Sequence, residues 1–155
     1  MFPLIKEIPV PDLIAVLGQV PRDGVLLLDS ANQTHPLGRY SFLCCDPFDL
    51  IINENPFPKL EKALSHYHLP TLEGLPPFQG GIAGCFGYEI GGYLEALPRS
   101  PINDLNFPIC TLGFYDLVLG IDHWQQKAWV FSSGFPEIKE EKRLGRAKQR
   151  MQCPP

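Results

Sequence analysis

Residues 77–89 read Pro-Phe-Gln-Gly-Gly-Ile-Ala-Gly-Cys-Phe-Gly-Tyr-Glu, and this stretch is the most informative guide to the fold. In an extended strand, successive side chains point to opposite faces. One face would carry only small residues and the other mostly large ones: Gly81, Ala83, Cys85 and Gly87 against Ile82, Phe86 and Tyr88. A small-residue face lets a sheet, a backbone segment or a flat ligand approach closely. We therefore expect a closely packed strand, with direct ligand contact as the alternative.

The glycines of this stretch do not match a nucleotide-binding loop. The phosphate-binding loop of nucleoside triphosphatases ends in Gly-Lys-Ser/Thr, and no lysine follows the glycines here. The dinucleotide fingerprint lies between a strand and a helix, whereas Leu75-Pro76-Pro77 precedes these glycines. The alternation of small and large residues explains the pattern better.

Short apolar runs separated by turn residues lie on both sides of this stretch. Runs typical of strands occupy residues 25–28, 39–45, 48–52, 109–121 and 127–132, and helical spacing predicts helices over 11–19, 58–67 and 136–151. Pro11 suits the first turn of the first helix. Leu60, Leu64 and Tyr67 lie on one face of the second. Strands outnumber helices, which predicts an α+β fold with a mostly antiparallel sheet.

The composition of the chain excludes several classes of protein. The chain has 155 residues, a formal net charge of −4 and 45% hydrophobic residues, which is typical of one globular domain. The acidic excess argues against binding to nucleic acid. No run of 18 apolar residues predicts a membrane span, and the first residues do not resemble a secretory signal. We therefore expect a cytoplasmic protein.

The five cysteines do not form a metal or redox motif. Their number is odd, and no Cys-x-x-Cys pair occurs. Zinc sites and thioredoxin-type couples use such pairs. Most of the cysteines lie in apolar runs, where a free thiol behaves as a small hydrophobic side chain.

Asp116 and the histidines are the side chains that could carry acid–base chemistry. Asp116 lies within an apolar strand, so it is expected to be buried and bonded to backbone or to Arg39; a catalytic acid with a raised pKa is the alternative. His66 and His68 are two residues apart on a predicted helix and diverge, so they cannot chelate one ion. No complete active site is visible, and we expect no catalytic residue, cofactor or metal site in this chain.

Three segments together resemble the amino-terminal region of the chorismate-utilising family, which includes the component I synthases of aminodeoxychorismate and anthranilate. They are Leu27-Leu28-Asp29-Ser30-Ala31, then residues 38–47, and then the Pro-Phe-Gln-Gly-Gly stretch continuing through residue 98, with Gly113-Phe114-Tyr115-Asp116 after a gap. The resemblance covers residues 25 to 123, and Pro-Phe-Gln-Gly-Gly is its most specific part.

The resemblance implies a fold and a reaction. The family fold is a layered α/β/β/α assembly with orthogonally packed sheets. Its enzymes aminate chorismate with ammonia from a glutamine amidotransferase subunit, assisted by Mg²⁺. Aminodeoxychorismate leads toward p-aminobenzoate and folate, and anthranilate leads toward tryptophan. The catalytic region follows later in the family, so residues 1–135 are expected to form the amino-terminal domain, residues 136–155 a charged helix and tail, and the chain alone to be inactive.

The resemblance also implies a tryptophan-type pocket. Family members hold tryptophan in this region, and the matching positions are Leu28, Ser30, Arg39, Tyr40 and Ser41. The serines would offer hydroxyls to an amino-acid head group, and Tyr40 an aromatic wall. The anthranilate synthases carry Leu-Leu-Glu-Ser, where this chain has Asp29. That difference favours the aminodeoxychorismate branch; the anthranilate branch and a stand-alone binding module for an aromatic small molecule are the alternatives.

Overall fold

A computed structural model describes residues 3–20, 23–98 and 104–152. These residues form eight strands, three α-helices and two short 3-10 helices. The elements are β1 (Leu4–Ile8), α1 (Leu13–Leu17), β2 (Leu26–Leu28), η1 (Pro36–Gly38), β3 (Tyr40–Cys44), β4 (Asp49–Ile52), α2 (Phe57–His66), β5 (Gly81–Phe86), η2 (Tyr88–Tyr93), β6 (Cys110–Tyr115), β7 (Leu117–Asp122), β8 (Lys127–Ser132) and α3 (Glu140–Gln152). The predicted α+β fold is confirmed.

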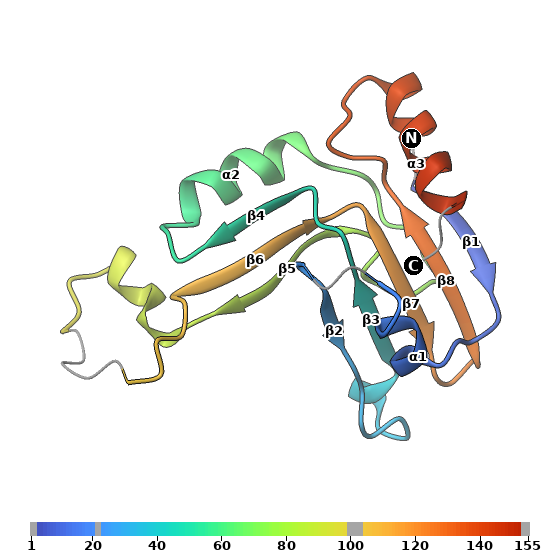
Figure 1. Cartoon of the computed structure of the whole chain (residues 1–155), viewed down its shortest axis with the longest axis horizontal. Helices are drawn as coiled ribbons and strands as arrows, with labels where there is room; N and C mark the ends of the chain where they lie inside the picture. The colour runs from blue at the N-terminus through green and yellow to red at the C-terminus, as the bar shows by residue number, and fades with distance from the viewer. Residues whose placement is uncertain (1–2, 21–22, 99–103, 153–155) are drawn as a thin grey trace.

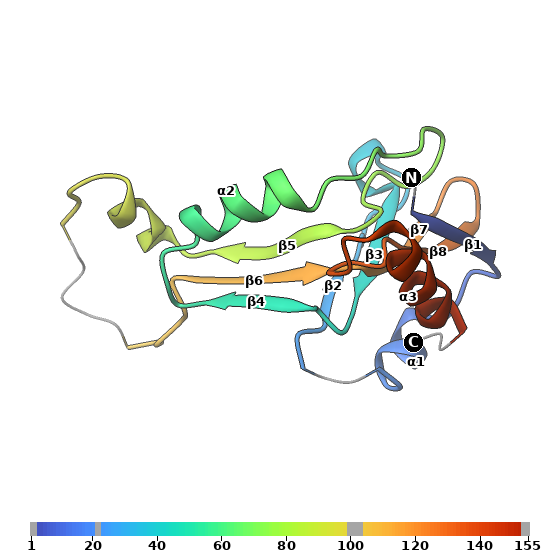
Figure 2. The same ribbon diagram turned by 90° about the horizontal axis from the view of Figure 1, so that it is seen from above.

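The strands form two antiparallel sheets. A five-stranded sheet has the order β1-β8-β7-β3-β2, and a three-stranded sheet has the order β4-β6-β5. The strands of the smaller sheet run across the direction of β7 and β8, and α2 covers one of its faces (Figures 1 and 2). α1 and α3 lie at the larger sheet.

The chain passes between the sheets at Asp116. The sequence predicts one strand over residues 109–121, but β6 belongs to the small sheet and β7 to the large one. The periodicity could not show this break, because both strands are apolar and almost wholly buried. The Asp116 carbonyl accepts a 2.9 Å bond from the Ser133 amide, which fixes the corner.

Three apolar clusters hold the sheets and helices together. One lies between the large sheet, α1 and Met151 of α3, and a second lies between the small sheet and α2. The third fills the junction of the sheets around Cys44, Tyr115 and Val118. At this junction the Tyr115 hydroxyl donates a 2.8 Å bond to the Gly24 carbonyl, and burial raises its pKa to about 12.

The helices are close to their predicted positions, with three corrections. The charged helix α3 begins at Glu140 and not at residue 136. α1 begins at Leu13 because the Asp12 carboxylate accepts bonds from the amides of Ile14 and Ala15 at 2.9 and 3.3 Å, so Pro11 lies before the helix and not in its first turn. Leu60 of α2 and Tyr67, the residue that caps its C-terminus, pack against the small sheet, whereas Leu64, predicted to share their face, is 63% exposed.

The small-residue face of β5 is only partly packed. Ala83 contacts the junction cluster, but Cys85 is exposed. The closest approach is instead at Gly84, where an added Cβ would lie 2.0 Å from the Thr111 carbonyl oxygen of β6. On the large-residue face, Ile82 packs beneath α2, while Phe86 is 51% and Tyr88 96% exposed. Close packing in this stretch is therefore confirmed within the sheet and not on the predicted face.

The cysteines that the structure describes are free thiols. Cys44, Cys45 and Cys110 are buried free thiols, as expected, and burial raises the pKa of Cys44 to about 12. Cys153 lies outside the described residues. Within the described ranges, no helix is long and apolar enough to cross a membrane.

Candidate functional site

The residues expected to form a tryptophan-type pocket lie together at one end of the β2–β3 pair. Leu28 is the last residue of β2, opposite Phe42 of β3, and is 46% exposed. Tyr40 and Ser41 open β3, and Arg39 directly precedes it. The structure therefore brings all five predicted positions, including Ser30, to one edge of the large sheet.

Ser41 is the centre of a closed hydrogen-bond network. Its buried hydroxyl lies 2.8 Å from Asp29 Oδ1 and 2.7 Å from His123 Nε2, and it accepts a 3.0 Å bond from the Ser30 amide. Because a carboxylate only accepts, Ser41 donates its single hydrogen to Asp29. His123 must then donate from Nε2, which assigns its tautomer.

This network changes the role expected of the two serines. Ser41 uses its donor and both acceptor positions within the protein, and the Ser30 hydroxyl donates a 2.6 Å bond to the Tyr40 carbonyl. Ser41 therefore positions its neighbours. The exposed Asp29 carboxylate, whose Oδ2 has no partner among the described residues, is the group best placed to meet a ligand ammonium.

Sequence reasoning missed His123 as a member of this cluster. His123 directly follows β7, and it comes to Ser41 because β3 pairs with β7, with the His123 amide donating a 2.9 Å bond to the Arg39 carbonyl. His123 and Ser41 are 82 residues apart in the chain. Only a known pairing of β3 with β7 could have revealed the contact.

Arg39 is engaged by Asp122 and not by Asp116. Its Nη2 lies 2.6 Å from Asp122 Oδ2, and its guanidinium lies over the rings of Tyr40 and Trp124. Burial acts to raise the pKa of Asp122, but bonds from Arg39 and from the amides of Gln125 and Trp124 outweigh it, so the pKa of this carboxyl is lowered. The expected Arg39–Asp116 contact is therefore wrong.

Asp116 binds α3 instead. Its carboxylate is fully buried and lies 3.4 Å from Arg146 Nε and 3.2 Å from Arg150 Nη2, and Arg150 also pairs with Asp46. Burial raises the pKa of Asp116, although both arginines act in the opposite direction. These contacts give the carboxylate a structural partner and favour the structural interpretation over a catalytic acid.

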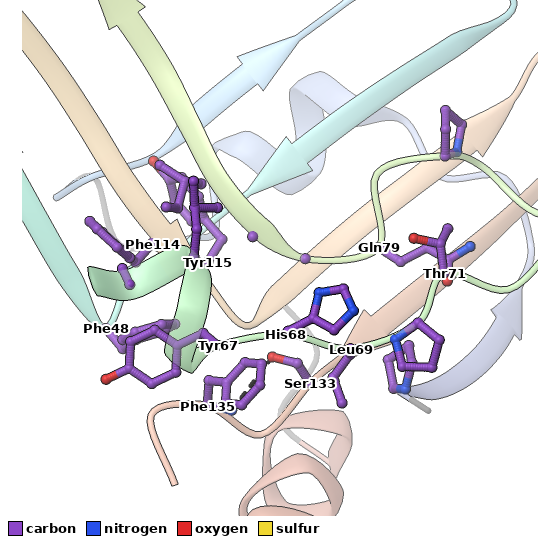
Figure 3. A pocket seen from close by; sticks show the side chains of 18 residues that line it. Phe48, Tyr67, His68, Leu69, Thr71, Gln79, Phe114, Tyr115, Ser133 and Phe135 are labelled. Carbon is purple, nitrogen blue, oxygen red and sulfur yellow. Dashed lines mark hydrogen bonds between the residues drawn. The ribbon is translucent and has the colours of Figure 1, made fainter. Parts of the chain in front are cut away.

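A cavity of about 280 Å³ lies elsewhere, between the end of α2, the start of β5 and the segment after β8. Aromatic side chains gather on one side, and Thr71 and Gln79 lie on the other (Figure 3). Phe48, Tyr67, Phe114, Tyr115 and Phe135 supply the aromatic wall. Nothing in the sequence signalled this cavity, because its walls come from six separated segments.

No metal centre is evident in the described part of the chain, where no three His, Cys, Asp or Glu side chains are grouped so that they could hold an ion. His66 and His68 do not converge with other such ligands. Asp29 and the aromatic surfaces are groups that can contact a ligand.

The known proteins to which the chain is similar include component 1 synthases of aminodeoxychorismate and of anthranilate. No protein-family model matches the chain. The chain is 31% identical over 125 residues to aminodeoxychorismate synthase component 1 of Salmonella typhimurium, covering 69% of this chain and 28% of that protein. It is 29% identical over 122 residues to anthranilate synthase component 1 of Acetivibrio thermocellus, covering 67% of this chain and 25% of that protein.

The fold has a counterpart among solved structures. Anthranilate synthase component I from Streptococcus pneumoniae superimposes with a TM-score of 0.57 at 20% identity, over 94% of this chain and 35% of that one. The likeness at this identity concerns the fold alone. The chain thus spans about a third or less of the length of the proteins that it matches.

Proposed function

The chain belongs to the chorismate-utilising synthase family, and on that premise we propose that it is the amino-terminal region of aminodeoxychorismate synthase component I. The observation that carries the proposal is the agreement of sequence and fold: relatives named as component 1 synthases align over two thirds of the chain, and a component I fold covers 94% of it. Residues 1–135 are the domain proper, and residues 136–155 add a charged helix and tail.

The activity proposed for the whole protein is amination of chorismate toward p-aminobenzoate and folate, in the cytoplasm. A glutamine amidotransferase partner would supply ammonia, and Mg²⁺ would assist on the catalytic region. This chain contributes no catalytic residue: Asp116 is committed to Arg146 and Arg150. Incubation of the purified chain with chorismate, ammonia and Mg²⁺ should yield no aminodeoxychorismate, and formation of that product would contradict the proposal.

The anthranilate branch is the second candidate. Component 1 proteins of both kinds align at about the same identity, 31% and 29%. Asp29, where the anthranilate synthases carry glutamate, supports the first branch. A stand-alone module that binds an aromatic small molecule is the third candidate, and it requires binding without any partner chain.

A tryptophan-type ligand is proposed at Leu28, Ser30, Arg39, Tyr40 and Ser41. Leu28 and Tyr40 would flank the indole, and the free oxygen of Asp29 would accept the ligand ammonium. Ser41 and His123 would hold the Asp29 carboxylate in place, at 2.8 and 2.7 Å along the network. Ser30 fixes the backbone that carries Asp29, through its bonds to Tyr40 and Ser41.

Titration calorimetry with tryptophan tests this assignment. The unchanged chain should release heat, Asp29→Asn should weaken binding about tenfold by removing the ammonium's counter-charge, and Ser30→Ala should weaken it less. Ser65→Ala is a matched control, because Ser65 lies exposed on α2 and, within the described part of the chain, its hydroxyl bonds only to the Lys62 carbonyl. Absence of heat with every form of the chain would end the proposal of a tryptophan site.

A further inference from the structure

The cavity beside α2 is separate from the cluster around Ser41, and it carries an inference that does not depend on the proposed function. Its volume of about 280 Å³ lies just below the range of roughly 300–1,000 Å³ that drug-sized ligands occupy. A smaller organic molecule therefore fits its size.

The aromatic wall is held rigidly by its own contacts. The Phe48 ring lies 5.3 Å from that of Tyr67 and 5.9 Å from that of Phe114, and the Tyr67 ring lies 5.1 Å from that of Phe135, all between ring centroids. Rings in tilted and edge-on contact at these distances attract one another. The wall thus presents preformed aromatic surface to an occupant.

The opposite wall is also preformed. Gln79 is 6% exposed, and its side-chain amide bonds to both backbone groups of Leu72, at 3.0 and 2.8 Å, and to the Pro76 carbonyl at 3.2 Å. These bonds fix the loop that leads into β5. Gly80 follows with φ +123°, a backbone conformation that favours glycine, and it lines the cavity near Ser133.

One buried hydroxyl is available inside the cavity. Ser133 is 6% exposed, and its Oγ accepts a 3.5 Å bond from the Phe135 amide. Among the described residues its hydrogen has no acceptor, so it can donate to a ligand oxygen. The described residues that line the cavity include no Asp, Glu, Lys or Arg, so a charged ligand would lose its hydration without gaining a fixed counter-charge from them. His68 is exposed and is the remaining titratable group apart from the two tyrosines.

We propose that this cavity is a binding site for a small, uncharged aromatic molecule that carries one carbonyl or hydroxyl oxygen. The ring lies against the wall formed by Phe48, Tyr67 and Phe135, and the oxygen accepts the hydrogen of Ser133. Ala63 of α2 borders the same space and is 7% exposed.

The test uses acetophenone as the probe, with backbone amide shifts of the ¹⁵N-labelled chain as the readout. Saturable shifts are expected at Gly80, Gly81 and Ser133, and benzoate, of similar size but charged, should bind more weakly. Ser133→Ala should weaken acetophenone about threefold to tenfold, as loss of one hydrogen bond does. Ala63→Leu should abolish saturable shifts by filling the space, provided that its spectrum remains that of a folded chain.

Two controls separate this site from the tryptophan-type site. Ser30→Ala and Ser65→Ala should leave acetophenone binding unchanged. Unsaturated or scattered shifts, shifts confined to the region of Ser30, equal affinity for benzoate, or unchanged affinity in Ser133→Ala would each overturn the proposal.

Discussion

The two candidate sites of this chain differ in how their polar groups are used. Around Ser41, each hydrogen-bonding position of the central hydroxyl is occupied by Asp29, Ser30 or His123. The cavity beside α2 has room for a ligand, and its Ser133 hydroxyl makes one weak bond among the described residues, to the Phe135 amide. The side chains around Ser41 are held in place by bonds within the protein, whereas in the cavity the Ser133 hydroxyl can still donate a hydrogen bond to a ligand.

The largest effect is expected at the edge of the first cluster. Asp122→Ala removes the acceptor of the Trp124 and Gln125 amides, at 3.0 and 3.1 Å, and the partner of Arg39. We expect the free energy of unfolding to fall by about 2–3 kcal/mol, from lost bonds to a charged acceptor. Urea denaturation measures it, and a loss no greater than that of an exposed control such as Glu61→Ala on α2 would contradict the importance of this anchor.

The pH dependence of the same anchor has a defined sign. The folded pKa of Asp122 is lowered from 3.8, so its ionised form stabilises the fold above the unfolded pKa, and this contribution is lost as pH falls below 3.8 through the folded value. The Asp122→Asn chain should therefore lose less stability than the unchanged chain as the pH falls below 3.8. Parallel pH profiles of the two chains in urea denaturation would contradict the assignment.

The same substitution, serine to alanine, can be made in both sites and its cost in stability compared. Ser41→Ala leaves Asp29, His123 and the Ser30 amide without their shared partner, and should cost about 1–3 kcal/mol of unfolding free energy. Ser133→Ala removes one 3.5 Å bond and should cost clearly less. If urea denaturation gives equal losses, the distinction between a closed network and a free donor is wrong.

A filling substitution gives the smallest expected change. Ala63→Leu places three more carbons beside an existing cavity, so the free energy of unfolding should stay within about 1 kcal/mol or rise. Overpacking of an already filled core costs about 1–3 kcal/mol. Thermal unfolding distinguishes the outcomes, and a loss in that range would show that the space is not available.

The sequence predicted local elements well because their signals are local. The turn after residue 122 and the helix near 58–67 follow from turn residues and helical spacing. The division of residues 109–121 between two sheets could not be predicted, because it depends on which distant strands pair with β6 and β7.

The candidate sites, like the fold, could be predicted from the sequence only in part. The resemblance brought Ser30, Arg39 and Ser41 to attention, and the structure places them together. The resemblance did not reveal that every hydrogen-bonding position of the Ser41 hydroxyl is occupied, or that His123 belongs to the cluster. Both depend on the contact between Ser41 and His123, which are 82 residues apart in the chain. The cavity depends on contacts between separated segments that carry no common motif.

We propose that a tryptophan-type ligand binds at the end of the β2–β3 pair. Amide shifts of the ¹⁵N-labelled chain during titration with tryptophan test it most directly. We expect saturable shifts at Ser30, Tyr40, Ser41 and His123, which Asp29→Asn suppresses, while Gly80 and Gly81 remain unchanged. Saturable shifts confined to the cavity, or no saturable shifts at all, would contradict the claim.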